Sequence, residues 1–261
     1  MEDIKKSTQN DQVEFMELDL SSLRSIGDFA TAFKAKNLPL HLLLNNAGVQ
    51  GHLYALTEDG IEIHFGTNHI GHFFLTLLLI DTLVKSQPSR IVTVSSMAYD
   101  WAPQDGIPLD HLNDEAGYSP TRAYTQSKLA NILFTRELAK RIGDQKVFAN
   151  SLHPGVIKSE INRHVLSRTL ALFRPLVKGF IGLMTSPENG ALTQLYLSTS
   201  PDVEEKNIRG EYYVPVGKKG RLSPLGCNDE QAKKLWDFSV KFIKEKVPDF
   251  EVPEALRDRA A

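Results

Sequence analysis

The sequence has a single cysteine, Cys227, so the chain cannot form an internal disulfide bond. The histidines do not form a recognisable metal site either. His69, His72 and His153 have no further ligand at a spacing that suits a metal ion, and we interpret them as structural side chains. These absences favour a reducing compartment, with the cytoplasm as the expected location, and a protein without a structural metal.

The chain also lacks an excess of charge of one sign. Its 30 Lys and Arg residues nearly balance 32 Asp and Glu residues, for a formal net charge of -2. The sequence shows no basic patch that could follow a nucleic-acid backbone. We therefore expect a small molecule as the binding partner, and no nucleic acid.

A hydrophobic run long enough to cross a membrane is missing as well. The longest apolar run, IGHFFLTLLLIDTLV at 70–84, includes His72 and Asp81 and is shorter than the roughly 20 residues of a spanning helix. We predict a buried core helix there and no transmembrane segment. The charged start, MEDIKKSTQNDQ, has no apolar stretch of the kind that a signal peptide needs.

Glycine-rich phosphate loops are absent too. Neither G-x-G-x-x-G nor G-x-x-x-G-x-G occurs in the chain. The segment 66–71 is not a P-loop, because His72 stands where that motif requires Lys. The sequence therefore has no recognisable motif for cradling a pyrophosphate at a helix N-terminus.

Apolar strand patterns alternate regularly with helical patterns along the chain. The predicted strands are 13–18, 41–44, 90–96, 147–155 and 211–216, and the predicted helices are 1–8, 21–36, 70–84, 122–142, one after 187 and one from 228. This order predicts an α/β fold. We expect one domain over residues 1–261, built on a doubly wound parallel sheet with helices on both faces.

Polar groups follow several of these strands directly. Asp19, the NNAG turn at 45–48, Ser96 and the HPG turn at 153–155 each stand just after a predicted strand. Ligands of doubly wound sheets bind beyond the carboxyl ends of the strands. We therefore expect these groups to gather at one edge of the sheet and to form the binding site.

The stretch AYTQSK places Tyr124 and Lys128 four residues apart at the start of a helix. Residues at this spacing share a helix face, and both residue types are ordinary on a solvated one. The chemical interpretation is that a Lys ammonium beside a phenol lowers the phenol pKa from about 10 toward neutrality. Such a tyrosine could exchange a proton with an alcohol or a carbonyl.

Five motifs in this order, NNAG, GTNHIGHF, VSS, YTQSK and HPG, resemble the short-chain dehydrogenase/reductase family. The resemblance runs from about Val13 to the final helix. It is closest to the retinol dehydrogenase and WW-domain oxidoreductase branch, as NHIGHFFLT, YTQSKLANILF and LHPGVI indicate. It implies a Rossmann-like sheet and hydride transfer to or from a nicotinamide cofactor.

The resemblance implies a catalytic tetrad of Asn68, Ser96, Tyr124 and Lys128. In such a tetrad Tyr124 is the acid/base and Ser96 bonds the substrate oxygen, while Ser95 is structural. Lys128 lowers the tyrosine pKa and binds the nicotinamide ribose, and Asn68 holds a proton-relay water. From the residues alone, Asn68 could instead bond helix backbone, and Ser96 could simply cap the strand end.

The resemblance also implies a set of cofactor-binding residues. They are Asp19, Leu20, Asn45, Ala47, Gly48, Tyr124, Lys128, Pro154, Gly155, Val156 and Ser159, the last standing where relatives usually have Thr. The structural alternatives are that Asp19 is only a helix cap and that Asn45 and Gly48 are only turn residues. The branch favours NADP(H) over NAD(H).

Substrate preference should come from the apolar segment 159–184, which we interpret as a substrate lid, with a kinked core helix as the alternative. The expected substrate is a lipophilic alcohol, aldehyde or ketone. A homodimer through the helices at 68–84 and 122–142 is a possible assembly, since this arrangement is usual for the family.

The family's first strand, its T-G-x-x-x-G-x-G loop and its second strand have no counterpart in this sequence. The absent first β-α-β portion would amount to something on the order of 40 residues. Two hypotheses follow. Either the sequence is an incomplete reading of a full-length reductase, or the short chain serves as a non-catalytic binding or interaction protein.

Overall fold

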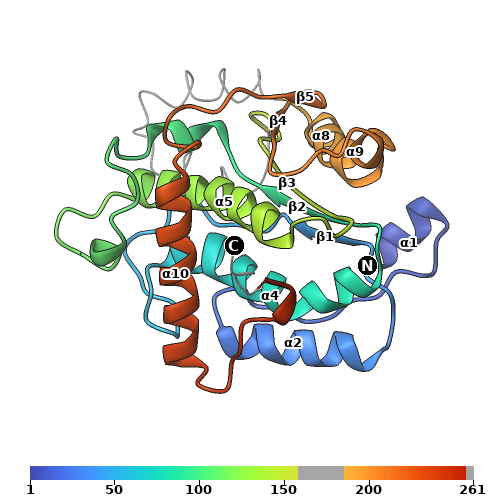
Figure 1. Cartoon of the computed structure of the whole chain (residues 1–261), viewed down its shortest axis with the longest axis horizontal. Helices are drawn as coiled ribbons and strands as arrows, with labels where there is room; N and C mark the ends of the chain where they lie inside the picture. Colours follow the sequence, from blue (N-terminus) through green and yellow to red (C-terminus); the bar gives the residue numbers. More distant parts are fainter. Residues whose placement is uncertain (158–184, 257–261) are drawn as a thin grey trace.

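The computed structural model describes residues 1–157 and 185–256, and these form a mostly parallel sheet flanked by helices (Figure 1). The strands of this part are β1 (Leu42–Asn45), β2 (Ser89–Val94), β3 (Val147–Leu152), β4 (Tyr212–Val214) and β5 (Lys218–Lys219). They lie in the order β1-β2-β3-β4-β5. The first four run parallel, and only β5 pairs antiparallel to its neighbour.

The helices that connect these strands confirm the predicted α/β class. The α-helices are α1 (Glu2–Thr8), α2 (Leu23–Ala35), α3 (Ile63–Phe65), α4 (Gly71–Lys85), α5 (Pro120–Ile142), α8 (Pro187–Thr199), α9 (Asp202–Glu205) and α10 (Asp229–Lys246). Short 3-10 helices are η2 (Met97–Trp101), η3 (Leu109–His111) and η6 (Glu254–Leu256), and η1 (Gly66–Ile70) is a π-helix.

The sheet separates two hydrophobic cores, as the doubly wound prediction requires (Figure 1). On one face, residues of α2, α4, α5 and α10 pack with Ile91 and Ala149 from the sheet. On the other face, Val92 and Phe148 pack with Leu197 from α8. Every residue of β2 and β3 is buried, so their carboxyl ends are rigid supports for the segments that follow.

Helix α5, which carries Tyr124 and Lys128, begins at a capping signal in the local sequence. The Ser119 hydroxyl accepts a hydrogen bond from the Arg122 backbone N–H, and Pro120 occupies the first turn, where its missing N–H costs nothing. The helix therefore starts two residues before the predicted Arg122. Its 23 residues pack on β2 and β3.

One predicted strand is wrong. Residues 13–18 form no strand, and the Phe15 side chain is 76% exposed. A strand needs a neighbour to accept and donate its ladder hydrogen bonds, and none of β1 to β5 pairs with this segment. The absent first β-α-β portion stays a prediction, and the proposed lid at 159–184 lies entirely outside the described residues.

The apolar run at 70–84 is confirmed as a core helix. The continuous helical stretch Ile63–Lys85 has the length and hydropathy of a membrane span, yet 78% of its most apolar window is buried inside the protein. Buried core helices of soluble proteins commonly satisfy the same criterion. Of the described helices, no other does so.

Helix α10 packs along α5 and reaches α4 through Trp236. Its Trp236 ring lies 4.9 Å from the Phe73 ring of α4 and 6.2 Å from the Phe134 ring of α5, measured between centroids. Figure 1 shows α10 crossing in front of α5. The homodimer through the helices at 68–84 and 122–142 stays a prediction.

Two histidines of the η1–α4 stretch are buried in a neutral form. Burial lowers the pKa of His69 to about 3 and that of His72 to about 4. The His69 Nε2 atom lies 2.9 Å from the Ser239 hydroxyl, which itself donates to Leu235 O, so the ring nitrogen donates. The interpretation of both residues as structural side chains is consistent with this burial.

These depressed pKa values predict acid sensitivity. Because unfolded histidine has a pKa near 6.5, the unfolded state binds protons more readily, and stability is lost as pH falls below that value. By proton linkage, the shifted pKa of His69 alone lowers the free energy of unfolding by about 2 kcal/mol between pH 7 and pH 5. Urea denaturation at the two pH values should show a smaller loss for His69→Gln, which keeps a donor toward Ser239. An equal loss in both proteins would contradict the assignment.

Candidate active site

Tyr124 and Lys128 lie one turn apart on the first half of α5, against the carboxyl end of β2. Both are buried, with exposed fractions of 8% and 3%. The Lys128 Nζ atom lies 5.7 Å from the centroid of the Tyr124 ring. The pair therefore does not belong to a solvated helix face, which was the alternative interpretation.

The Lys128 ammonium donates a hydrogen bond to Val94 O at 3.2 Å. No carboxylate pairs with it among the ion pairs of the described residues. Burial consequently lowers the pKa of Lys128 to about 8. A buried cation without an acidic partner is costly, and groups of this kind concentrate at functional sites.

The sequence predicts that Lys128 lowers the pKa of Tyr124, and the structure corrects this. Burial raises the pKa of Tyr124 above its ordinary value, and a hydrogen bond with Ser96 offsets only part of that rise. The physical reason is that burial removes the phenolate from water, which disfavours the charged form. At neutral pH the phenol therefore keeps its proton.

Ser96 and Ser95 follow β2 and have separate tasks. Ser96 is half-buried, its side chain reaches Tyr124, and its Oγ also accepts a hydrogen bond from Ala98 N at 3.1 Å, which caps η2. The Ser95 hydroxyl donates to Lys128 O at 2.6 Å. This bond ties the end of β2 to α5, in agreement with a structural role for Ser95.

Asn68 lies in the π-helix η1 and is completely buried. Its Oδ1 accepts a hydrogen bond from Val49 N at 2.7 Å, and its Nδ2 donates to Val49 O at 3.0 Å and to the Ser127 hydroxyl at 2.9 Å. The side chain therefore joins the turn after β1 to α5. It does not bond the backbone of its own helix, which was the bland alternative.

Ser127 is a site residue that the sequence analysis did not single out. Its hydroxyl accepts from Asn68 and donates to Tyr124 O at 2.7 Å. The available signal was a serine three residues after the tyrosine, a spacing at which its hydroxyl can bond helix backbone.

The NNAG turn approaches the tetrad at Gly48. A Cβ atom on Gly48 would lie 3.0 Å from Asn68 Oδ1 and 3.4 Å from Lys128 Nζ, which is tighter than ordinary packing. Asn45, at the end of β1, donates from Nδ2 to the Thr76 hydroxyl at 3.0 Å, while Ala47 is exposed. The turn thus brings bare backbone against the buried ammonium.

The remaining predicted cofactor residues lie in two further segments. Asp19 is exposed and accepts hydrogen bonds from the backbone and hydroxyl of Ser21, whereas the cap of α2 is Ser22. Asp19 as a helix cap is therefore wrong. Leu20 packs against Gly71 at the start of α4, immediately after η1.

The HPG turn follows β3. Pro154 and Gly155 are partly exposed, and Gly155 takes φ 95, a conformation that favours glycine. Val156 is 43% exposed, and its carbonyl accepts a hydrogen bond from Thr185 N at 2.9 Å. Ser159 lies outside the described residues.

A polar cluster connects the segments that follow β1 and β2. The Tyr118 hydroxyl donates to Glu62 Oε1 at 2.8 Å, and the same carboxylate oxygen lies 2.7 Å from His64 Nδ1. Tyr54 donates from its hydroxyl to Asn113 O at 2.8 Å. These bonds hold the two segments together beside the carboxyl edge of the sheet.

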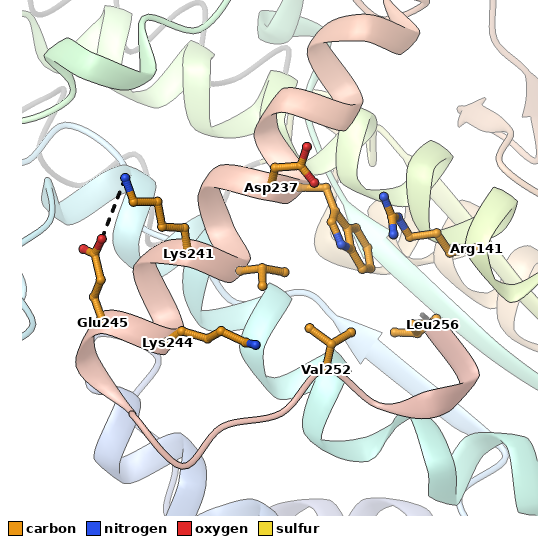
Figure 2. A pocket seen from close by; sticks show the side chains of 9 residues that line it. Arg141, Asp237, Lys241, Lys244, Glu245, Val252 and Leu256 are labelled. Atoms are coloured by element: carbon orange, nitrogen blue, oxygen red, sulfur yellow. Dashed lines mark ion pairs between the residues drawn. The ribbon is translucent and has the colours of Figure 1, made fainter. Parts of the chain in front are cut away.

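A surface pocket of about 610 Å³ lies elsewhere, between α10 and the end of α5 (Figure 2). Arg141, which lines it, is 17 residues beyond Tyr124 on α5, or about 25 Å along a helix. Lys241 pairs with Glu245 at 3.9 Å at its rim. This pocket is therefore separate from the tetrad.

The tetrad itself offers acid/base chemistry. A buried phenol that retains its proton, a hydroxyl beside it and an unpaired ammonium are arranged around one turn of exposed backbone. Together they can orient a carbonyl or alcohol oxygen and exchange a proton with it. Within the described part of the chain, His, Cys, Asp and Glu side chains nowhere form a group that could hold a metal ion.

Comparisons with known proteins establish the family of the chain. Residues 1–105 match the family model described as short chain dehydrogenase. The chain is 44% identical over 233 residues to retinol dehydrogenase 14 of Mus musculus, with 89% of this chain and 67% of that protein covered. It is 41% identical over 243 residues to retinol dehydrogenase 12 of Homo sapiens, with 92% and 73% covered.

A solved structure extends the agreement to the fold. An uncharacterized protein from Mycobacterium Paratuberculosis is similar with a TM-score of 0.66 and 31% identity, over 97% of this chain and 81% of that one. The chain spans about two thirds to three quarters of the curated relatives' length. It belongs to the short-chain dehydrogenase/reductase family, in the retinol dehydrogenase branch of oxidoreductases that act on CH–OH donors.

Proposed function

We propose that the protein interconverts a lipophilic alcohol and its aldehyde or ketone, using NAD(P)(H) and Tyr124 as the acid/base. The observation that carries this proposal is the buried Lys128 ammonium, which has no carboxylate partner in the described chain and stands over the Tyr124 ring. A purely structural lysine would be expected to have an acidic partner or an exposed amino group.

The protonated phenol suits the reductive direction. Tyr124 gives its proton to the substrate oxygen, which Ser96 orients by a hydrogen bond. The Lys128 ammonium then stabilises the phenolate that remains, because a charge interacts strongly with a cation in a desolvated site. A bound nicotinamide cofactor supplies or accepts the hydride. In oxidation, the phenolate form of Tyr124 takes the proton from the alcohol.

The residues present fit the nicotinamide ribose end of such a cofactor. The backbone of Gly48 approaches the Lys128 ammonium closely, and that ammonium has donors to spare for ribose hydroxyls. The buried Oδ1 of Asn45 has no hydrogen-bond partner, so the edge of the turn also retains an acceptor. NADP(H) over NAD(H) stays a prediction.

A first experiment measures cofactor binding. Gly48→Ala should raise the Kd for NADPH by about tenfold or more, since crowding a tight contact costs about 1–3 kcal/mol. The matched control is Gly27→Ala in α2, where an added Cβ meets no atom within 4 Å. Titration by cofactor fluorescence with NADPH and NADH gives both the affinity and the preference.

Each result of this titration decides between the two hypotheses of function. Binding by the wild-type chain that Gly48→Ala weakens and Gly27→Ala does not would support the cofactor site. A folded wild-type chain that binds neither nucleotide would support the alternative, a non-catalytic binding or interaction protein. That alternative is motivated by the lack of a glycine-rich phosphate loop in the sequence.

A lipophilic substrate is supported by the segments that follow β1 and β2. Leu53 and Leu56 in the first segment are 69% and 45% exposed, and Met97 and Trp101 in the second are 48% and 69% exposed. Exposed apolar side chains gathered near a site favour an apolar ligand. Relatives are named retinol dehydrogenase and polyprenol dehydrogenase, after lipophilic alcohols.

A comparison of competing substrates tests the proposal of a lipophilic substrate. With NADPH, kcat/KM for a retinoid or long-chain aldehyde should exceed that for a small polar aldehyde by a factor of about 100 or more, because each buried methylene contributes about 0.8 kcal/mol. Trp101→Ser should reduce this preference. Comparable kcat/KM values for both aldehydes would exclude the lipophilic assignment.

The role of Tyr124 has its own test. Tyr124→Phe should lower kcat by about 10²- to 10⁴-fold, the usual contribution of a general acid, while the melting temperature and the NADPH affinity stay unchanged. Tyr212→Phe is the matched control, because Tyr212 is equally buried and its hydroxyl has no partner. Undiminished turnover by Tyr124→Phe would refute the assignment.

Location and assembly stay predictions. The expected cytoplasmic location has no direct support, since relatives from Brassica napus are named chloroplastic. The expected homodimer uses the helices at 68–84 and 122–142. No nucleic-acid partner is proposed, given the balanced charge.

A further inference from the structure

His72 lies one turn after Asn68 and is bonded to it. The His72 Nδ1 atom lies 2.9 Å from Asn68 O, and a carbonyl can only accept, so Nδ1 carries the hydrogen. The side chain is 2% exposed. Burial and the nearby Lys128 cation lower its pKa to about 4, so the ring is a neutral donor at physiological pH.

The bond occurs where the helix is least regular. Asn68 belongs to the π-helix η1, in which Gly71 N–H bonds Gly66 O five residues earlier. In a π turn the carbonyls leave the regular i to i+4 pattern, and such turns are frequent at functional sites. A side-chain donor from the next turn therefore gives the Asn68 peptide a defined orientation.

His72 is itself held from the far side. The Thr76 hydroxyl donates to His72 O at 2.7 Å, and Asn45 Nδ2 donates to that hydroxyl at 3.0 Å. A chain of hydrogen bonds thus runs from the end of β1 along α4 to Asn68. From Asn68 it continues to Val49 and, through the Ser127 hydroxyl, to α5.

We propose that His72 is a positioning residue of the reaction. Its Nδ1–H bond to the Asn68 carbonyl sets the π turn, and the turn aims the Asn68 amide at Val49 and Ser127. This inference rests on the proposed function for its effect on turnover. Its effect on the Asn68–Val49 contact does not depend on catalysis.

The chain offers a matched control for burial. His69 is also fully buried, three residues earlier, but its Nε2 bonds Ser239 on α10 instead of the site. Loss of either imidazole should cost stability, whereas only loss of His72 should disturb the tetrad. His69→Leu therefore separates a structural effect from positioning.

Three substitutions at His72 separate the donor from the ring. His72→Asn keeps an N–H at the same distance from Cβ as Nδ1, His72→Gln moves it one bond further, and His72→Leu removes it. Relative to wild type, kcat should fall by about tenfold to a hundredfold in the Leu and Gln variants, with the NADPH Kd within about twofold. His72→Asn should restore most of the activity, and His69→Leu should retain it.

Hydrogen exchange of the Val49 amide provides the second readout, because that N–H is bonded to Asn68 Oδ1. It should exchange about tenfold faster in the Leu and Gln variants than in wild type or His72→Asn. If the wild type shows no turnover but this pattern appears, the proposed function fails and the positioning role stands. If turnover is present and His72→Gln changes neither kcat nor Val49 exchange, the positioning role is overturned. His72→Gln decides the matter even where His72→Leu does not fold.

Discussion

The buried ammonium of Lys128 is the constraint on which the rest of the site depends. Removing a cation from water is expensive, and the described chain offers it one carbonyl and no carboxylate. The surrounding structure must hold it there: the Ser95 hydroxyl fastens the Lys128 peptide to the end of β2, and Asn131 shares the same Val94 carbonyl. The packed sheet and α5 thus maintain a buried charge without a carboxylate partner over the Tyr124 ring.

A second requirement is that three elements far apart in sequence keep fixed positions relative to one another around the Lys128 ammonium. The π turn at Asn68 meets the turn after β1 through Val49 and meets α5 through Ser127. Helix α4, which continues from the π turn, is anchored to the core by packing of Phe73 against Phe134 and Trp236. Apolar packing therefore fixes where α4 and α5 lie, and hydrogen bonds fix how their polar groups face each other.

Much of the fold could be predicted from local pattern. The continuous apolar runs of β2 and β3, and the Ser119–Pro120 start of α5, are short-range signals that survive in the structure. The segment at 13–18 carried an equally plausible strand pattern, yet Phe15 is exposed. A strand exists only through hydrogen bonds to a neighbour, and a single segment does not contain that information.

The sequence by itself determined which chemical groups are present and that Asn68, Ser96, Tyr124 and Lys128 follow or flank strands that end at one edge. Only the tertiary structure decided how those groups behave. The pKa of Tyr124 is raised because burial outweighs the hydrogen bond with Ser96. Ser127 and His72 join the candidate site through contacts that spacing alone does not reveal. Motifs record residue identity, whereas desolvation and hydrogen-bond geometry arise from the packing of distant segments.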